Sequence, residues 1–122
     1  MRGRSLDAEI HWEGNSLEVL SRFPSGVKQD LGYNLRRLQQ GKAPLCASRP
    51  MQSIGKGVFE LKEQDERTWY RVIYLARIRN VIYVLHCFEK DTRKTEARHI
   101  ETAKARLKDV HRSLRETKSE GE

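Results

Sequence analysis

The sequence has few of the residues on which several classes of small protein depend. It contains two cysteines, Cys46 and Cys87, which have no CxxC spacing. We therefore expect a reduced chain without a disulfide framework. The first seven residues contain no apolar segment of the kind that marks a secretory signal, so we expect the protein to be cytoplasmic. Nowhere does the chain approach the roughly 20 apolar residues of a membrane span.

Motifs for metals and nucleotide cofactors are also missing. The four histidines, His11, His86, His99 and His111, show no ligand spacing, so neither a metal site nor a cofactor is expected. The short Gly55-Lys56-Gly57 segment precedes a strand-like run, whereas phosphate-binding glycine loops are longer and precede a helix.

Charge is abundant, and it is mostly positive. The 122 residues include 24 Lys and Arg against 17 Asp and Glu, which gives a net charge of +7. Such an excess favours a polyanionic partner, with nucleic acid ahead of an anionic membrane surface. A chain of this length has room for one compact domain. We expect a single domain over residues 1–122, with its core at about 8–116 and a frayed, charged C-terminal tail.

Hydrophobic periodicity predicts two helices in the first third of the chain. Residues 8–12 alternate in the manner of a short strand, and Asn15 or Ser16 is suited to cap a helix. A second helix follows, with apolar residues at helical spacing from Val27 to Leu38, and Gly41 is a plausible stop. Residues 42–53 contain two prolines and no clear period, which indicates a loop.

The second half predicts three strands and a last helix. Residues 58–62, 69–76 and 81–88 are alternating or rich in β-branched and aromatic side chains, and residues 77–80 form a short hairpin connection. From Ile100 to Leu114, apolar residues repeat on one helical face. The order β-α-α-β-β-β-α predicts an α+β fold in which helices cover one face of a small antiparallel sheet.

An arginine in the middle of a predicted strand is the most informative single residue. Arg71 interrupts an otherwise apolar run, and burying an unpaired guanidinium is strongly unfavourable. Either Glu60 on the neighbouring strand pairs with it, or it faces a wet concavity that binds an anion. Lys62 and Lys90, each at the end of a strand, would converge with Arg71 at one end of the sheet.

Such a cationic cluster suits RNA cleavage by the ribose 2′-hydroxyl. The protein must stabilise the extra negative charge on the nonbridging oxygens of the phosphorane, and it must supply a base and an acid. Candidates for proton transfer are Glu60, His86, Lys90 and the strand tyrosines Tyr70, Tyr74 and Tyr83. For His86 the alternative is a hydrogen bond within the sheet, and for the tyrosines it is core packing.

A basic track for RNA is a further expectation. Residues 31–59 include no Asp or Glu at all. The candidate RNA-binding residues here and further along are Arg36, Arg37, Lys56, Arg77, Arg79, Arg93 and Lys94. For any one of them, the alternative is an ordinary solvated charge.

Four short motifs in order carry a family resemblance: residues 57–62, 70–74, 84–90 and 92–95. The pattern resembles phage-derived Gp49-like, HigB-type toxins of the RelE superfamily, over about residues 10–114. The resemblance implies a RelE-like fold, a small antiparallel sheet with two N-terminal helices packed on it and a C-terminal helix. It further implies ribosome-dependent cleavage of messenger RNA and a helix-turn-helix, HigA-like antitoxin as partner. In it, Arg71 binds the scissile phosphate and Lys90 is a second basic residue.

The chain departs from that family pattern at three positions. Lys62 stands where relatives usually have arginine, which keeps the charge and loses the bidentate fork. Asp91 stands where such toxins commonly have lysine, and Glu96 where they often have proline. These departures reduce positive charge near the expected site.

Two other classes of function remain open at this stage. A noncatalytic nucleic-acid-binding or regulatory protein would use the same basic surface without cleaving RNA. A structural interaction module would use the charged C-terminal helix to meet an acidic protein, although the acids Glu101, Asp109 and Glu116 also suit a solvated helix face.

Overall fold

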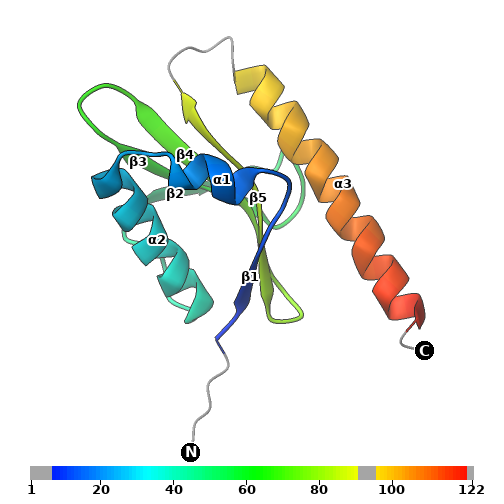
Figure 1. The fold of residues 1–122 in the computed structure, drawn as a ribbon. Helices are drawn as coiled ribbons and strands as arrows, with labels where there is room; N and C mark the ends of the chain where they lie inside the picture. Colours follow the sequence, from blue (N-terminus) through cyan, green and yellow to red (C-terminus); the bar gives the residue numbers. More distant parts are fainter. Residues whose placement is uncertain (1–6, 91–95, 121–122) are drawn as a thin grey trace, which may run out of the picture.

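The protein forms a five-stranded sheet with helices on both of its faces (Figure 1). The computed structural model describes residues 7–90 and 96–120, with side chains up to residue 116. Its elements are β1 (Glu9–Trp12), α1 (Ser16–Ser21), α2 (Ser25–Gln39), β2 (Ala47–Pro50), β3 (Val58–Gln64), β4 (Trp69–Ile78), β5 (Val81–Lys90) and α3 (Glu96–Glu120). The α+β class is therefore confirmed. α3 continues to Glu120, into the segment that was expected to fray.

The sheet is mixed, and in this respect the prediction of an antiparallel sheet was wrong. Its strand order is β1-β5-β4-β3-β2, with β1 parallel to β5 and the other neighbours antiparallel. β2 lies within the segment that was predicted to be a loop. All four of its residues are exposed, and it is a strand only because it pairs with β3, at the sheet edge where Pro50 is tolerated.

Helices on both faces also correct the expected single covered face. One apolar cluster joins α1 and α2 to the sheet through residues such as Leu31 and Val72. A second cluster, on the opposite face, joins α3 to the sheet through residues such as Ile73 and Leu107. Because side chains alternate along a strand, Val72 and Ile73 face opposite layers. Both must be buried, which explains the continuous apolar runs of β4 and β5.

A β-bulge in β5 changes which residues point toward α3. Ile73 pairs with His86, whereas its neighbour Tyr74 pairs with Val84, so Leu85 is the extra residue. Leu85 packs in the α3-facing cluster, and His86 contacts side chains of α3. A bulge of this kind redirects a side chain that regular alternation would place on the other face.

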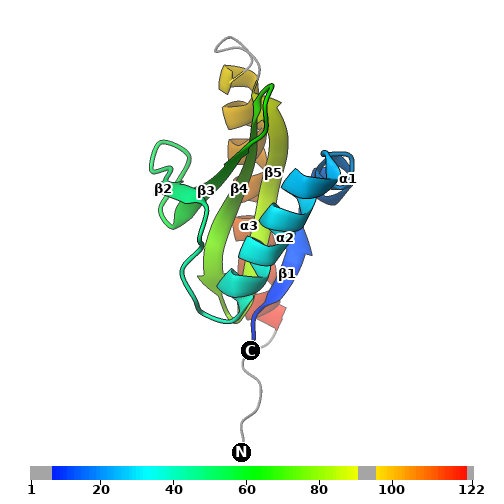
Figure 2. The same cartoon turned by 90° about the vertical axis from the view of Figure 1, so that its left-hand side faces the viewer.

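The sheet has two distinct ends, which Figures 1 and 2 show from different sides. At one end lie the turn between β3 and β4, the end of β5 and the first turn of α3. At the other end lie the β4–β5 hairpin and the last turn of α2. The hairpin turns at Arg79 and Asn80, which both have positive φ (52° and 66°), as a two-residue turn requires. Within the described residues, no helix has the length and apolar character to cross a membrane.

Candidate functional site

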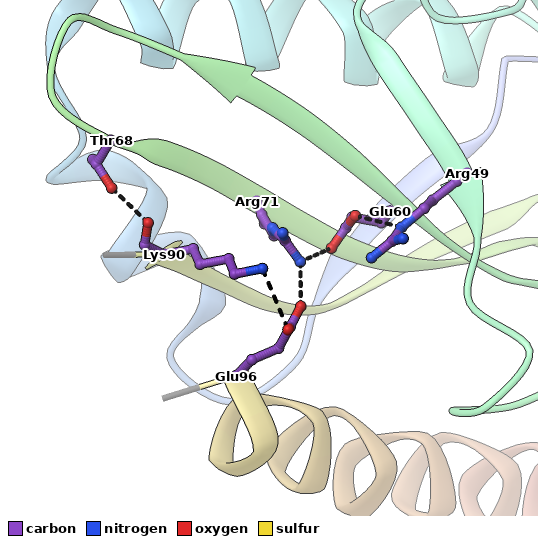
Figure 3. Close-up of polar contacts among 6 residues, drawn as sticks. All are labelled: Arg49, Glu60, Thr68, Arg71, Lys90 and Glu96. Atoms are coloured by element: carbon purple, nitrogen blue, oxygen red, sulfur yellow. Dashed lines mark hydrogen bonds and ion pairs between the residues drawn. The ribbon is translucent and has the colours of Figure 1, made fainter. Parts of the chain in front are cut away.

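Arg71 lies on β4 at the first of these ends, on the face toward α3, and is 5% exposed. Its NH1 donates to Oε2 of Glu60, at 3.0 Å, and to Oε1 of Glu96, at 2.5 Å (Figure 3). Glu60 is fully buried on β3, and its other carboxylate oxygen accepts from Nε of Arg49 at 3.1 Å. The predicted pairing of Arg71 with Glu60 is therefore confirmed, and both oxygens of Glu60 are bound to guanidinium groups.

Glu96, in the first turn of α3, also contacts Lys90. The Nζ of Lys90 lies 3.3 Å from Oε2 of Glu96, so the carboxylate joins two cations on β4 and β5 (Figure 3). Burial disfavours the ionised carboxylate, but the hydrogen bonds and charges of Lys90 and Arg71 outweigh it, and the pKa of Glu96 is lowered. Glu96 is thus an anion that occupies the cationic site.

Lys62 is the third cation at this end of the sheet. It is the register partner of Arg71 on β3, so both side chains emerge on the same face. Its Nζ lies 5.2 Å from the ring centroid of Trp69, a residue that is 37% exposed and pairs with Lys90. Lys62, Arg71 and Lys90 therefore lie at the same end of the sheet, where Arg71 and Lys90 share Glu96 and Lys62 lies over Trp69.

One buried polar atom of Arg71 has no hydrogen-bond partner among the residues that the structure describes. Its Nε makes no hydrogen bond with any described residue, although the guanidinium is nearly fully buried. Buried N–H groups are rarely left in this state in folded proteins. The unused N–H group fits a site that is completed by an anionic ligand, since Arg can present two N–H groups to one phosphate.

His86 is held in a directional chain of hydrogen bonds. NH1 of Arg106 lies 3.1 Å from Nδ1 of His86, and Nε2 of His86 lies 2.7 Å from Nδ1 of His99. A guanidinium can only donate, so Nδ1 of His86 accepts and the proton of the neutral ring is on Nε2, from which it is donated to His99. Burial and the charges of His99 and Arg106 lower the pKa of His86 to about 4. His86 is therefore neutral at physiological pH. Its side-chain hydrogen bonds go to residues of α3 and not to groups within the sheet, which was the expected alternative.

The candidate tyrosines are not brought to Arg71. Tyr70 and Tyr74 pack in the cluster under α1 and α2, on the other face of the sheet. Burial raises the pKa of both to about 12, in Tyr70 with help from its hydrogen bond to Asp65. Tyr83 faces the α3 layer but is paired with Leu75, toward the hairpin end.

Most of the predicted RNA-binding residues also lie away from Arg71. Arg36 pairs with Asp7, Arg37 donates to the carbonyl of Ala43, and Arg77 donates to the carbonyl of Gln39. With Arg79 in the hairpin turn, these arginines belong to the opposite end of the sheet. Lys56 is exposed in the loop between β2 and β3, and Arg93 and Lys94, with Asp91, lie outside the described residues.

Within the described part of the chain, no group of three His, Cys, Asp or Glu side chains is placed to hold a metal ion. The cationic groups and their two carboxylates are thus the chemistry that this site offers.

Residues 18–108 match the family model of phage-derived Gp49-like proteins (DUF891). The chain belongs to this family. It is a family of RelE/HigB-like toxins. The match runs from α1 into α3, and it includes every residue of the site of this Gp49-like protein, from Arg49 to Arg106. No curated protein and no solved structure gave a match.

Three residues of the site in this Gp49-like protein were not anticipated as parts of it. In the sequence, Glu96 is notable only as a departure from the family pattern. His99 is one of four histidines without ligand spacing, and Arg106 is one of several charged residues in the last predicted helix. Their signal is weak but real, because Glu96, His99, Ala103, Arg106 and Leu107 recur at intervals of three and four on one side of a helix.

Proposed function

We propose that the protein is the toxin of a type II toxin–antitoxin system, a ribosome-dependent endoribonuclease that cleaves messenger RNA and thereby arrests translation. The observation that carries the proposal is the cationic site: Arg71, Lys62 and Lys90 gather at one end of the sheet, and Arg71 has an N–H group that no described residue uses. Membership of a toxin family supports it. The proposed inhibitor is a helix-turn-helix, HigA-like antitoxin.

In the proposed reaction, the scissile phosphate replaces the carboxylate of Glu96 on Arg71 and Lys90. The 2′-hydroxyl loses its proton to solvent water as its oxygen attacks phosphorus. The bond to the 5′-oxygen breaks, and this oxygen takes a proton from a cationic side chain of the site, which gives a 2′,3′-cyclic phosphate and a 5′-hydroxyl. Arg71 stabilises the charge that grows on the nonbridging oxygens, and Lys62 and Lys90 flank it. No metal is required, because these cations supply the positive charge.

The hydrogen bonds of the candidate side chains support one choice of proton-transfer group for this reaction. Both oxygens of Glu60 are bound to arginines, so its part is to orient Arg71. His86 is neutral and hydrogen-bonded on both ring nitrogens. Among the residues predicted from the sequence, Lys90 is then the candidate that lies at the site with a proton to give, and we assign it to the departing 5′-oxygen.

Mapping of cleavage sites on a translated message tests the proposal. We expect expression of the wild type to produce defined cuts and to stop growth, and Arg71→Ala to produce neither. Arg112→Ala is the matched control, since Arg112 is exposed on α3 and forms a local ion pair with Asp109. The same message without its start codon should remain intact if cleavage depends on the ribosome.

A noncatalytic nucleic-acid-binding protein is the second candidate, and the occupation of Arg71 and Lys90 by Glu96 favours it. In that case RNA binds with a steep salt dependence, and the translated message stays uncut by wild type and Arg71→Ala alike.

A further inference from the structure

A second concave site lies directly beside the cationic site. A cavity of about 430 Å³ opens between α1, the edge of β5 and the start of α3. It exists because β1 pairs with β5 only from Val81 to Val84, after which the chain turns into α1. Phe23, His86, Phe88 and His99 are among its lining residues, so four residues with rings border a space beside the length of β5 that β1 does not pair with.

Phe88 separates this cavity from Arg71. It is the register partner of Arg71, whose Cζ lies 5.9 Å from the centroid of its ring. The ring of Phe88 stacks on that of His99, with centroids 4.1 Å apart and planes 14° from parallel. His99 is one helical turn from Glu96, which contacts Arg71 directly. The cavity and the cationic site are therefore neighbours that share one aromatic side chain.

The polar lining of the cavity includes Asn15, Arg22 and Glu89, and Arg22 is already paired with Glu18 at 2.6 Å. This mixed lining suits a nucleobase better than a second phosphate. The exposed carboxylate of Glu89 lines it, and a carboxylate repels phosphate but accepts N–H groups from the edge of a base. Aromatic and histidine rings are the surfaces on which proteins stack the splayed bases of single-stranded RNA.

We propose that this cavity is a nucleobase-binding subsite, which receives the base of a nucleotide next to the phosphate held by Arg71. The inference rests on the proposed function, because it takes the ligand of the cationic site to be RNA. The subsite would let the protein discriminate between sequences, since the base edge meets Glu89 while its face meets the rings. Stacking of one base on a protein ring contributes affinity on its own, without recognition of the phosphate.

Equilibrium binding of small probes separates the base from the phosphate. Isothermal titration calorimetry of the protein with ribose 5-phosphate and with the four nucleoside 5′-monophosphates measures how much affinity each base adds. We call this gain in affinity the base increment. We expect at least one nucleotide to bind about tenfold more tightly than ribose 5-phosphate, as one stacked base provides. Equal affinities for ribose 5-phosphate and all four nucleotides would overturn the proposal.

Two variants test whether the base increment arises from binding in the cavity. Val19, on α1, lines the cavity, so Val19→Trp should fill it, abolish the base increment and leave binding of ribose 5-phosphate unchanged. Leu17→Trp is the matched control, because Leu17 is 49% exposed on the same helix and does not line the cavity. Glu89→Gln, at an exposed position, should lower the base increment without weakening binding of ribose 5-phosphate. A base increment that survives in both Val19→Trp and Glu89→Gln would overturn the proposal.

The outcome is independent of the cleavage assay. If nucleotides bind as expected but no translated message is cut, the proposed function fails and the subsite stands. If messages are cut but Val19→Trp keeps the base increment and loses binding to the antitoxin, the function stands and the cavity belongs to the protein partner.

Discussion

Glu96 bonds to Arg71 across the gap between α3 and β4, with 2.5 Å between its Oε1 and NH1 of the arginine. The carboxylate thereby binds the guanidinium group that binds the scissile phosphate in the proposed mechanism. RNA must compete with an anion that is tethered beside the site and whose lowered pKa keeps it ionised at neutral pH. The first turn of α3 is thus both a structural element of the site and its competitor.

Replacement of this carboxylate should strengthen RNA binding. We expect Glu96→Gln to bind a 2′-O-methylated, uncleavable RNA about fivefold more tightly, because a partly exposed ion pair contributes about 1 kcal/mol. Fluorescence anisotropy at constant salt measures this. Glu101→Gln, which removes an exposed acid from the same helix, should leave the affinity much less changed. Weaker binding by Glu96→Gln would mean that Glu96 assists RNA binding.

Loss of Glu60 should destabilise the fold. Glu60→Gln leaves the buried Arg71 with weakened compensation for its charge, and breaking a buried pair of this kind costs about 3 kcal/mol. Urea unfolding measures the change in the free energy of unfolding, with Glu66→Gln in the exposed β3–β4 turn as control. The double variant Glu60→Leu with Arg71→Met should lose less than the sum of its two single changes. Additive losses would show that the pair is not coupled.

The strands that form the centre of the sheet could be predicted from the sequence, whereas the edge strands and their pairing could be predicted less well. The long apolar runs of β4 and β5 indicate strands that are buried on both faces. A second helical layer on the opposite face of the sheet could therefore have been predicted from them. β2 could not be predicted from the sequence, because its four residues are exposed and form a strand only by pairing with β3. The parallel pairing of β1 with β5 likewise depends on tertiary contacts.

The same division applies to the candidate site. Arg71 and Glu60 were predicted because a charge in a buried strand requires a partner, and strand periodicity brings the two together. Glu96 and His99 contribute through the docking of α3. Their helical spacing indicates that they share one side of the helix, but it does not specify where that side packs on the sheet. The bulge at Leu85 turns His86 toward α3, and regular alternation would have placed it under α1.

Acid should destabilise the protein through His86. Its folded-state pKa of about 4 lies below the ordinary value of 6.5, so the stabilisation of the neutral ring is complete above pH 6.5 and is lost as the pH falls toward 4. Between these values the wild type should lose up to about 3 kcal/mol more than His86→Gln, which cannot titrate. Urea unfolding from pH 7 to pH 4 measures this, with the exposed His111→Gln as control. Parallel pH profiles for wild type and His86→Gln would contradict the assignment.

The arginines at the hairpin end should contribute to RNA binding only when the RNA is long. β4 has ten residues, so its two ends are about 30 Å apart, and a trinucleotide centred on Arg71 does not span that distance. Lys62→Ala should reduce the slope of log Kd against log salt by about 0.7 for short and long RNA alike, since one phosphate contact is lost. Arg79→Asn, which suits the positive φ of the turn, should have no effect on a trinucleotide. With an RNA long enough to reach the hairpin, a reduced slope for Arg79→Asn would extend the binding surface along the whole sheet, whereas an unchanged slope would confine it to the end at Arg71.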